Sequence, residues 1–248
     1  MAAYSLPQAG LRRLCSVSRE GIEARLAEVQ ARVTRAAEGA GRDPGSIEVL
    51  PVTKGHPPAA VEAVASAGLA CIGENRVPEA RDKQHRLGGR AGLTWHMIGR
   101  LQRNKARKAL DLFDVIESVD SLKLAATLSR IVEEEGREPV EILVEVNASG
   151  EGGKAGLTLD GAIPGIDEIC RLPGVRVSGL MTMAPHTDDE QVVRKTFRRV
   201  RELAGRCAEE VPAFEGGVLS MGMSNDFEIA IEEGSTRVRL GTVLLGER

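Results

Sequence analysis

Lys54 is the residue whose chemistry is easiest to state. It follows a β-branched run at residues 47–53 and precedes a Gly-His-Pro-Pro turn at residues 55–58. A lysine amine that loses part of its hydration releases its proton more easily, and the neutral amine can condense with an aldehyde. A lysine at such a place is more often a surface residue that ends a strand, so its interpretation depends on what surrounds it.

Two other segments could supply a phosphate site. Ser220, Gly222 and Ser224 fall in one short loop, and Gly241 and Thr242 fall in another. Glycines let backbone N–H groups approach an anion, hydroxyls add donors, and the helix predicted after the first loop favours negative charge at its start. Each loop alone is typical of an ordinary turn. Both loops together, opposite a lysine, indicate a site for a phosphorylated aldehyde.

Arg239 and His96 each allow two interpretations. A guanidinium is always charged and only donates hydrogen bonds. Beside the ring nitrogen of a bound pyridine, Arg239 would favour the unprotonated ring and weaken it as an electron sink. Alternatively, Arg239 pairs with a carboxylate in the protein. His96 either faces a ligand or forms a hydrogen bond in the core, which is more common for a histidine within a strand.

Alternating strands and helices must position these residues. Such alternation implies parallel pairing with right-handed crossovers, and the number of units predicts an α/β fold, a single (β/α)8 TIM-type barrel with an extra N-terminal helix. A doubly wound sheet is the alternative, but no GxGxxG motif follows the first strand. At one rim of a barrel the C-terminal ends of all strands meet, which would bring the candidate residues together. The predicted strands are residues 47–53, 69–73, 94–98, 113–119, 140–146, 175–180, 217–221 and 236–240. The predicted helices are residues 18–38, 61–67, 76–87, 101–110, 121–135, 159–172, 188–210 and 225–233.

Composition excludes several classes of protein. The net charge of −3 and the pI of about 5.9 argue against a general nucleic-acid binder, and 2% aromatic residues argue against base stacking. No apolar stretch reaches the roughly 18 residues of a membrane span. A basic stretch nevertheless follows the third strand, and we interpret it as a solvated helix face rather than an RNA site. Its residues are Arg100, Arg103, Lys105, Arg107 and Lys108.

The cysteines and the N-terminal segment indicate the cellular compartment of the protein. No two cysteines form a CxxC pair, which is typical of reduced thiols in a cytoplasmic protein. Residues 1–17 lack a continuous apolar core and are predicted to be a flexible leader before one domain at residues 18–248. Organelle targeting by this arginine-containing leader is the alternative. The cysteines are Cys15, Cys71, Cys170 and Cys207.

Several motifs, in order along nearly the whole chain, resemble those of one family. The most specific are Trp-His-Met-Ile-Gly at residues 95–99, Leu-Ser-Met-Gly-Met-Ser at 219–224 and the segment 234–246. Shorter matches lie at residues 52–54, 73–77, 146–149 and 179–181. The sequence resembles the YggS/PROSC family of pyridoxal phosphate homeostasis proteins. Departures from the family pattern are Pro78, Leu245 and the pair Gly55-His56.

The resemblance implies a barrel similar to the N-terminal domain of alanine racemase, with pyridoxal 5′-phosphate (PLP) bound as a Schiff base to Lys54. It implies that Arg239 lies at the ring nitrogen, and that Asn75 and His96 lie near the pocket. Family members are described as binding PLP without an established catalytic activity and as affecting vitamin B6 balance. The residues implied to hold the phosphate are Ser220, Met221, Ser224, Gly241 and Thr242.

Three functions remain open at this point. We expect a monomeric PLP carrier that supplies apo-PLP enzymes and has no nucleic-acid or membrane partner. An amino-acid racemase would need an acid/base group on each face of the substrate α-carbon. The chain ends just after the last strand, and its only tyrosine is Tyr4. His96 or Cys71 would therefore have to be the acid/base group opposite Lys54. The third function is a Schiff-base aldolase that acts on a phosphorylated sugar without PLP.

Overall fold

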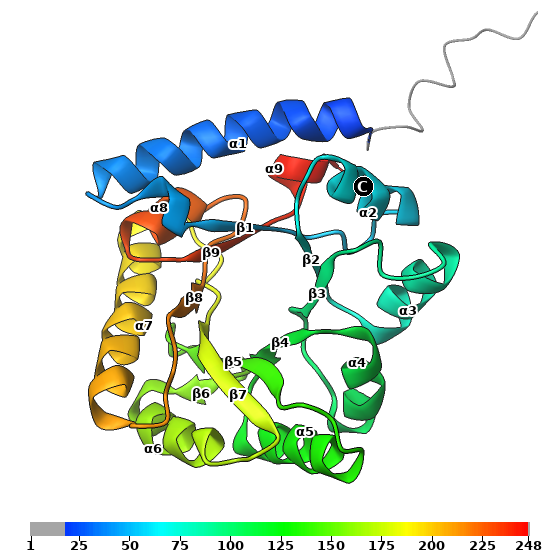
Figure 1. Cartoon of the computed structure of the whole chain (residues 1–248). Coiled ribbons are helices and arrows are strands. Elements are labelled where there is room, and N and C mark those ends of the chain that lie inside the picture. Colours follow the sequence, from blue (N-terminus) through cyan, green and yellow to red (C-terminus); the bar gives the residue numbers. More distant parts are fainter. Residues whose placement is uncertain (1–17, 248) are drawn as a thin grey trace, which may run out of the picture.

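A closed parallel barrel forms the centre of the molecule (Figure 1). The computed structural model describes residues 18–247, so the predicted leader, Cys15 and Tyr4 lie outside the described residues. The strands follow the order β1-β9-β8-β7-β5-β4-β3-β2, and a bridge between Val52 and Gly73 joins the two ends of this order. The predicted barrel is therefore confirmed. Its strands are β1 (Glu48–Pro51), β2 (Cys71–Glu74), β3 (Thr94–Met97), β4 (Val115–Val119), β5 (Val140–Asn147), β7 (Val175–Met181), β8 (Val218–Ser220) and β9 (Arg237–Leu240).

Helices cover the outside of the barrel and connect its strands (Figure 1). A two-residue strand, β6 (Leu157–Thr158), pairs with β5 outside the barrel path. The α-helices are α1 (Arg19–Gly39), α2 (Pro58–Ser66), α3 (Val77–Arg86), α4 (Ala106–Leu112), α5 (Leu122–Glu134), α6 (Leu159–Cys170), α7 (Glu190–Glu210), α8 (Phe227–Glu232) and α9 (Thr242–Leu245). Two 3₁₀ turns, η2 (Pro44–Ser46) and η3 (Arg103–Lys105), precede β1 and α4.

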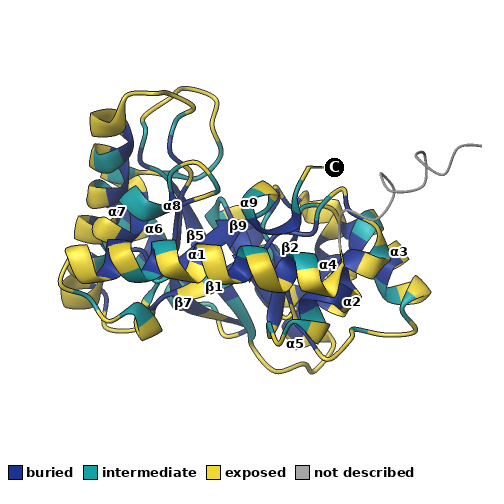
Figure 2. Ribbon diagram, turned by 90° about the horizontal axis from the view of Figure 1, so that it is seen from above, coloured by how far each residue is buried: buried dark blue, intermediate teal, exposed yellow. Residues whose placement is uncertain are grey.

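The extra helix α1 packs on the side of the barrel where β1 and β9 pair (Figure 1). Ser18 caps it by accepting a hydrogen bond from the Gly21 N–H at 3.1 Å. Ile22, Leu26, Val29 and Val33 recur at helical spacing and are buried, while the opposite face is exposed (Figure 2). The helix contacts α8 and α9. Helix α1 therefore packs against α9, the segment that follows the last strand.

The structure differs from the sequence prediction mainly at short elements. Helix α2 begins at Pro58, three residues before the predicted start, because proline suits the first turn of a helix. The predicted helix at residues 101–110 begins with the η3 turn and continues as α4. Helix α9 and strand β6 were not predicted, because four residues and two residues are too short to show a period.

Two glycines near the carboxyl ends of the strands have roles that other residues could not fill. A Cβ on Gly179 would lie 1.9 Å from the Val218 carbonyl oxygen, so this glycine allows β7 and β8 to pair. Gly222 has a φ of +95°, and a Cβ there would lie 2.6 Å from the Ala230 Cβ. The loop after β8 therefore depends on glycine for its path.

Within residues 18–247, no helix has the length and apolar character needed to cross a bilayer. The same residues bring together no group of three or more histidine, cysteine or acidic side chains that could hold a metal ion.

Candidate functional site

Three predicted site segments leave adjacent strands at the same rim of the barrel. Strands β1 and β9 pair in the register Pro51 to Leu240, and the Val52 N–H donates to the Leu240 carbonyl at 2.8 Å. The turn with Lys54 therefore lies beside the turn at residues 241–242. Strand β8 pairs with β9 on the other side, so the loop at residues 220–224 is next along the rim (Figure 1). The parallel topology thus gathers three segments that are far apart in the sequence.

A hydrogen bond joins the two loops that were predicted to hold a phosphate. The Val243 N–H, one residue after Thr242, donates to the Ser224 Oγ at 3.4 Å. Gly241 has a φ of −100°, which any residue can adopt, and a Cβ there would meet only Val52, at ordinary contact distances of 3.7 and 3.8 Å. Neither backbone strain nor packing requires glycine at residue 241. The open Cβ position is consistent with a ligand group that approaches the backbone at this rim.

The turn that carries Lys54 is fixed from outside the barrel. Lys54 is half-buried, and the His56 N–H donates to the Thr53 carbonyl at 3.0 Å within the turn. The Gly55 N–H donates to the Glu79 carboxylate at 2.5 Å. Helix α3, which carries Glu79, therefore holds the backbone on the C-terminal side of Lys54.

A buried ammonium group holds the other side of this turn. Lys83 donates to the Thr53 carbonyl at 2.7 Å, to Glu74 at 2.5 Å and to Glu79 at 3.0 Å. Burial raises the pKa of Glu74, although the charge and hydrogen bond of Lys83 act in the opposite direction. One Glu74 oxygen, Oε2, is buried without a partner among the described residues. This cluster fixes the end of β1 and was not predicted, because Lys83 lies in a sequence segment that reads as a polar surface helix.

A buried carboxylate in the barrel interior joins two of the predicted site residues. Glu117 accepts hydrogen bonds from the Ser220 hydroxyl at 2.6 Å and from Arg237 at 3.0 Å, and its Oε1 lies 2.8 Å from Nδ1 of His96. Burial would raise the pKa of Glu117, but His96, then Arg237 and Arg239, lower it to about 2. An ionised carboxylate only accepts hydrogen bonds, so the His96 Nδ1 carries the proton in this contact.

Arg239 is linked to this carboxylate through the Ser220 hydroxyl, and its own hydrogen-bond acceptors are neutral. It donates to the carbonyl of Ser220 at 2.6 Å, to the hydroxyl of Ser220 at 2.9 Å and to the carbonyl of Thr182 at 2.8 Å. Burial lowers the pKa of Arg239, while the nearby carboxylates, Glu117 first, favour its charge. Within residues 18–247 these contacts use three of the five guanidinium N–H donors, and no carboxylate forms an ion pair with it. The remaining donors are available for a ligand atom.

The remaining predicted residues occupy different positions around the rim. Met221, the first residue after β8, is fully buried, and Thr242 is exposed at the start of α9. Asn75 is half-buried and follows β2, so it lies on the side of the rim away from β8. Of the departures from the family pattern, Pro78 lies in the first turn of α3, which tolerates proline, and Leu245 is fully buried.

Glu117 and Arg237 are the site residues that sequence reasoning missed. Arg237 precedes Arg239 by two positions, and residues two apart in a strand share one face, so both side chains enter the barrel. Glu117 lies in a strand whose five residues are all buried. A charged residue inside an otherwise uncharged parallel strand is the signal that could have identified it.

Comparison with known proteins places this arrangement in a family. A family model described as the N-terminal domain of alanine racemase matches residues 24–248. The pyridoxal phosphate homeostasis protein of Pseudomonas aeruginosa is 40% identical over 223 residues, which cover 90% of this chain and 94% of that protein. The protein of the same name from Escherichia coli is 36% identical over 230 residues, covering 90% and 95% of the two chains.

Solved structures agree with the sequence comparison. An unknown protein from Bifidobacterium adolescentis has a TM-score of 0.84 at 38% identity, covering 91% of this chain and 95% of that one. PipY of Synechococcus elongatus, in a structure with PLP bound, has a TM-score of 0.79 at 35% identity, covering 91% and 100%. An alanine racemase from Clostridium difficile has a TM-score of 0.74 at 15% identity, covering 94% and 58%, which shows the fold alone.

The barrel and its rim therefore define a single-barrel relative of the alanine racemase N-terminal domain. More narrowly, the chain belongs to the family of pyridoxal phosphate homeostasis proteins, and the resemblance derived from its motifs is confirmed.

Proposed function

We propose that this protein holds PLP as a Schiff base on Lys54 and supplies it to apo-PLP enzymes, as a cytoplasmic monomer that takes part in vitamin B6 homeostasis. The observation that carries the proposal is the convergence of the Lys54 turn, the loop at residues 220–224 and the turn at residues 241–242 on three adjacent strands. The names of its relatives and the PLP-bound state of PipY support it independently.

Each group of the cofactor has a counterpart among these residues. The amine of Lys54 would bind the aldehyde carbon. The hydroxyls of Ser224 and Thr242, with the backbone at Gly241, would hold the phosphate where a Cβ is missing. Arg239 would donate to the ring nitrogen with an N–H that the protein leaves unused. Asn75 and His96 would lie toward the side of the ring opposite Arg239. Ser220 would position Arg239, and Met221 would position the loop after β8.

Arg239 also supports a carrier in preference to an amino-acid racemase. Bound PLP supplies an electron-withdrawing ring, and that ring withdraws most strongly when its nitrogen is protonated. A guanidinium has no proton acceptor and keeps the ring nitrogen in its neutral form. Burial disfavours the charge of this guanidinium, and the ionised Glu117 is the first of the nearby carboxylates that favour it. The site therefore favours holding the cofactor over stabilising a carbanion on it.

The candidates for a second acid/base group do not suit racemisation. His96 is buried and bonded to Glu117, which fixes one of its ring nitrogens. Cys71 is the first residue of β2, so it lies at the end of the barrel away from the rim. Burial, with a contribution from Glu48, raises the pKa of its thiol to about 12. Neither group is an effective partner for Lys54 across a substrate α-carbon.

The test is an absorbance scan of the purified protein with added PLP, followed by borohydride reduction and peptide mapping. We expect a visible band that borohydride removes, with the label on the peptide that contains Lys54. Lys54→Ala should lose both the band and the label, and the exposed control Lys108→Ala should keep both. A label on another lysine, or an unchanged band in Lys54→Ala, would overturn the assignment.

Supply and catalysis need separate assays. The PLP-loaded protein should restore activity to an apo-PLP enzyme as free PLP does, while alanine enantiomers incubated with it should not interconvert. Robust racemisation would favour the enzyme alternative. Absence of any PLP uptake would favour the aldolase alternative. Sedimentation at several concentrations should give the monomer mass of 26.5 kDa.

A further inference from the structure

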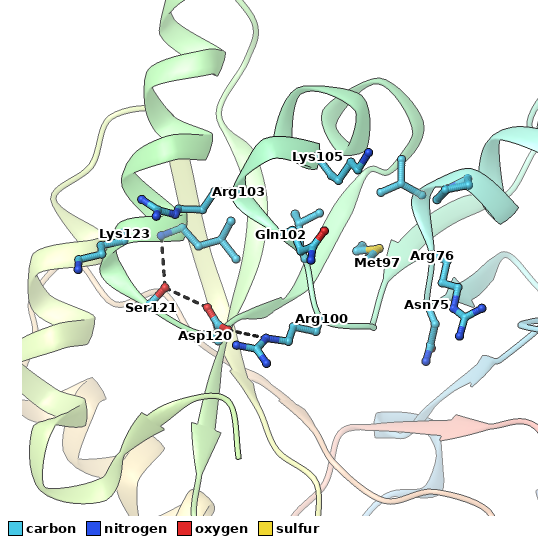
Figure 3. Close-up of a pocket in the computed structure, with 14 residues that line it drawn as sticks. Asn75, Arg76, Met97, Arg100, Gln102, Arg103, Lys105, Asp120, Ser121 and Lys123 are labelled. Carbon is cyan, nitrogen blue, oxygen red and sulfur yellow. Dashed lines mark hydrogen bonds and ion pairs between the residues drawn. The ribbon is translucent and has the colours of Figure 1, made fainter. Parts of the chain in front are cut away.

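A hollow beside the proposed PLP site has no role in the function proposed above. It opens at the ends of β2, β3 and β4, between the starts of α3 and α5, and has a volume of about 810 Å³ (Figure 3). Small-molecule sites are typically concave and span about 300–1,000 Å³. Asn75 borders it, so the hollow adjoins the proposed PLP site, but Lys54, Arg239 and the turns at residues 220–224 and 241–242 do not line it.

Cationic side chains surround this hollow. Five of them line it against a single carboxylate, Asp120, whose one cationic partner among residues 18–247 is Arg100, at a loose 3.8 Å. Figure 3 shows them on several sides, with Arg103 and Lys123 near the start of α5 and Arg76 next to Asn75. The five cations are Arg76, Arg100, Arg103, Lys105 and Lys123.

Most of this positive charge is uncompensated by the protein. Among residues 18–247, no carboxylate forms an ion pair with Arg103, Lys105 or Lys123. Arg107, only two residues after Lys105, behaves differently and pairs with both Glu134 and Glu135. The contrast matters because the chain as a whole is slightly acidic, with a net charge of −3. Positive charge gathered without partners around a concave surface attracts anions.

Two helices add to the positive electrostatic potential of this hollow. Helix α3, of ten residues, and helix α5, of thirteen residues, both begin at the hollow. The start of a helix carries a partial positive charge and exposes unpaired N–H groups. Ser121 caps α5 through the Leu124 N–H at 3.4 Å, but no side chain caps α3. Backbone donors at the start of α3 therefore remain for a ligand.

We propose that this hollow binds an organic polyphosphate, of the size and charge of a nucleoside diphosphate, beside and separate from the PLP site. Guanidinium groups on more than one side favour a ligand with several negative charges over a single phosphate. The buried side chains of Met97, Leu101 and Leu124 form an apolar part of the lining, which suits the organic portion of such a ligand. A concave site of this kind differs from the extended basic stripe that nucleic acids require.

The test is calorimetric titration with ADP, pyrophosphate and adenosine at a fixed ionic strength of about 0.15 M, where exposed charges are largely screened beyond about 8 Å. We expect saturable binding of ADP and pyrophosphate, with one site per chain, and no binding of adenosine. The variant Arg100→Gln/Arg103→Gln/Lys123→Gln should bind ADP about tenfold more weakly or worse, because it lacks three charged donors. Lys54→Ala should bind ADP as the wild type does, which separates this site from that of PLP.

The matched control removes the same charge elsewhere. Arg86→Gln/Arg130→Gln/Arg171→Gln changes three exposed arginines, each of which, within the described part of the chain, pairs only with a carboxylate four positions away. If this control weakens ADP binding as much as the first variant does, the binding is general electrostatics and the proposal fails. It also fails if neither ADP nor pyrophosphate binds saturably. Should the triple variant unfold, Gln102→Glu, which adds one negative charge to the lining, must weaken ADP binding.

Discussion

Replacing Glu117 with glutamine tests how far one buried carboxylate supports the barrel interior. Glutamine has nearly the same shape, but it is neutral, and one of its two terminal groups donates hydrogen bonds. It would face His96, Ser220 and Arg237, which all approach the native carboxylate within 3.0 Å. Arg237 would keep its ion pair with Glu48, and Arg239 would lose the carboxylate that most favours its charge.

The expected loss of stability follows from two separate estimates. Removing one partner of a buried charged pair costs about 3–5 kcal/mol. The pKa of Glu117 falls from 4.5 to about 2, which corresponds to about 3 kcal/mol at about 1.4 kcal/mol per unit. Both estimates give a decrease of about 3 kcal/mol or more at pH 7. For a chain of this size, a loss of about 3 kcal/mol should lower the melting temperature by about 6–12 °C.

The assay is urea unfolding followed by circular dichroism, for the wild type and for Glu117→Gln, from pH 7 to pH 2. Because the native pKa of Glu117 lies below its ordinary value, its contribution is complete above pH 4.5 and is lost as the pH falls toward 2. The stability difference between the two proteins should therefore shrink across this range. Glu134→Gln is the control, since its ion pairs with Arg107 and Arg130 are exposed and should contribute little.

Two results would refute this reasoning. One is a Glu117→Gln protein within about 1 kcal/mol of the wild type at pH 7, well short of the cost of an unpaired buried charge. The other is a stability difference that stays constant between pH 4.5 and pH 2. The double variant Glu117→Gln/Arg237→Gln provides a further check. It should be more stable than Glu117→Gln alone, because it also removes a buried cation that has lost its partner in the barrel interior and keeps only Glu48.

Two further predictions concern backbone packing and the turn before Lys54. Gly205→Ala should stabilise the protein by about 1 kcal/mol, since Gly205 lies exposed within α7 with open space at its Cβ position. Gly179→Ala should strongly destabilise it, because its Cβ would lie 1.9 Å from the Val218 carbonyl oxygen; equal melting temperatures for the two variants would contradict this. Lys83→Met should cost about 3–5 kcal/mol and reduce the PLP absorbance band, since it leaves Glu74 buried without its cation, whereas the exposed Lys123→Met should do neither.

Much of the fold could be predicted because the hydrophobic pattern changes regularly between strands and helices. The short apolar runs that end at Pro51 and Leu240 lie where they were expected, and this was enough to place Lys54 and Gly241 at one rim. The alternation of polar and apolar residues did not show that Glu117 points into the barrel, because a closed barrel buries strand residues on both faces and this alternation disappears.

The basic stretch after β3 shows a second limit of sequence reasoning. Its interpretation as a solvated helix face fits Arg107, which pairs with carboxylates on α5. Arg103 and Lys105 are exposed too, but they line the hollow, which the sequence did not show. Arg76 and Lys123 come from other segments, so only the folded barrel shows that these charges gather in one place. The periodic pattern of a single helix or strand does not show that side chains from separate segments come together.

The seam between β1 and β9 has a consequence for how the protein is made. Glu48 in β1 contacts Arg237 in β9, 189 positions later. As a nascent chain leaves the ribosome, β1 emerges early and its edge stays unpaired until β9 follows, and such long-range contacts close slowly. Lys54 and Gly241 lie just beyond the two strands of this seam. The proposed cofactor pocket should therefore be assembled only when synthesis is nearly finished, and a prematurely terminated chain would carry Lys54 without the turns that we propose hold the phosphate.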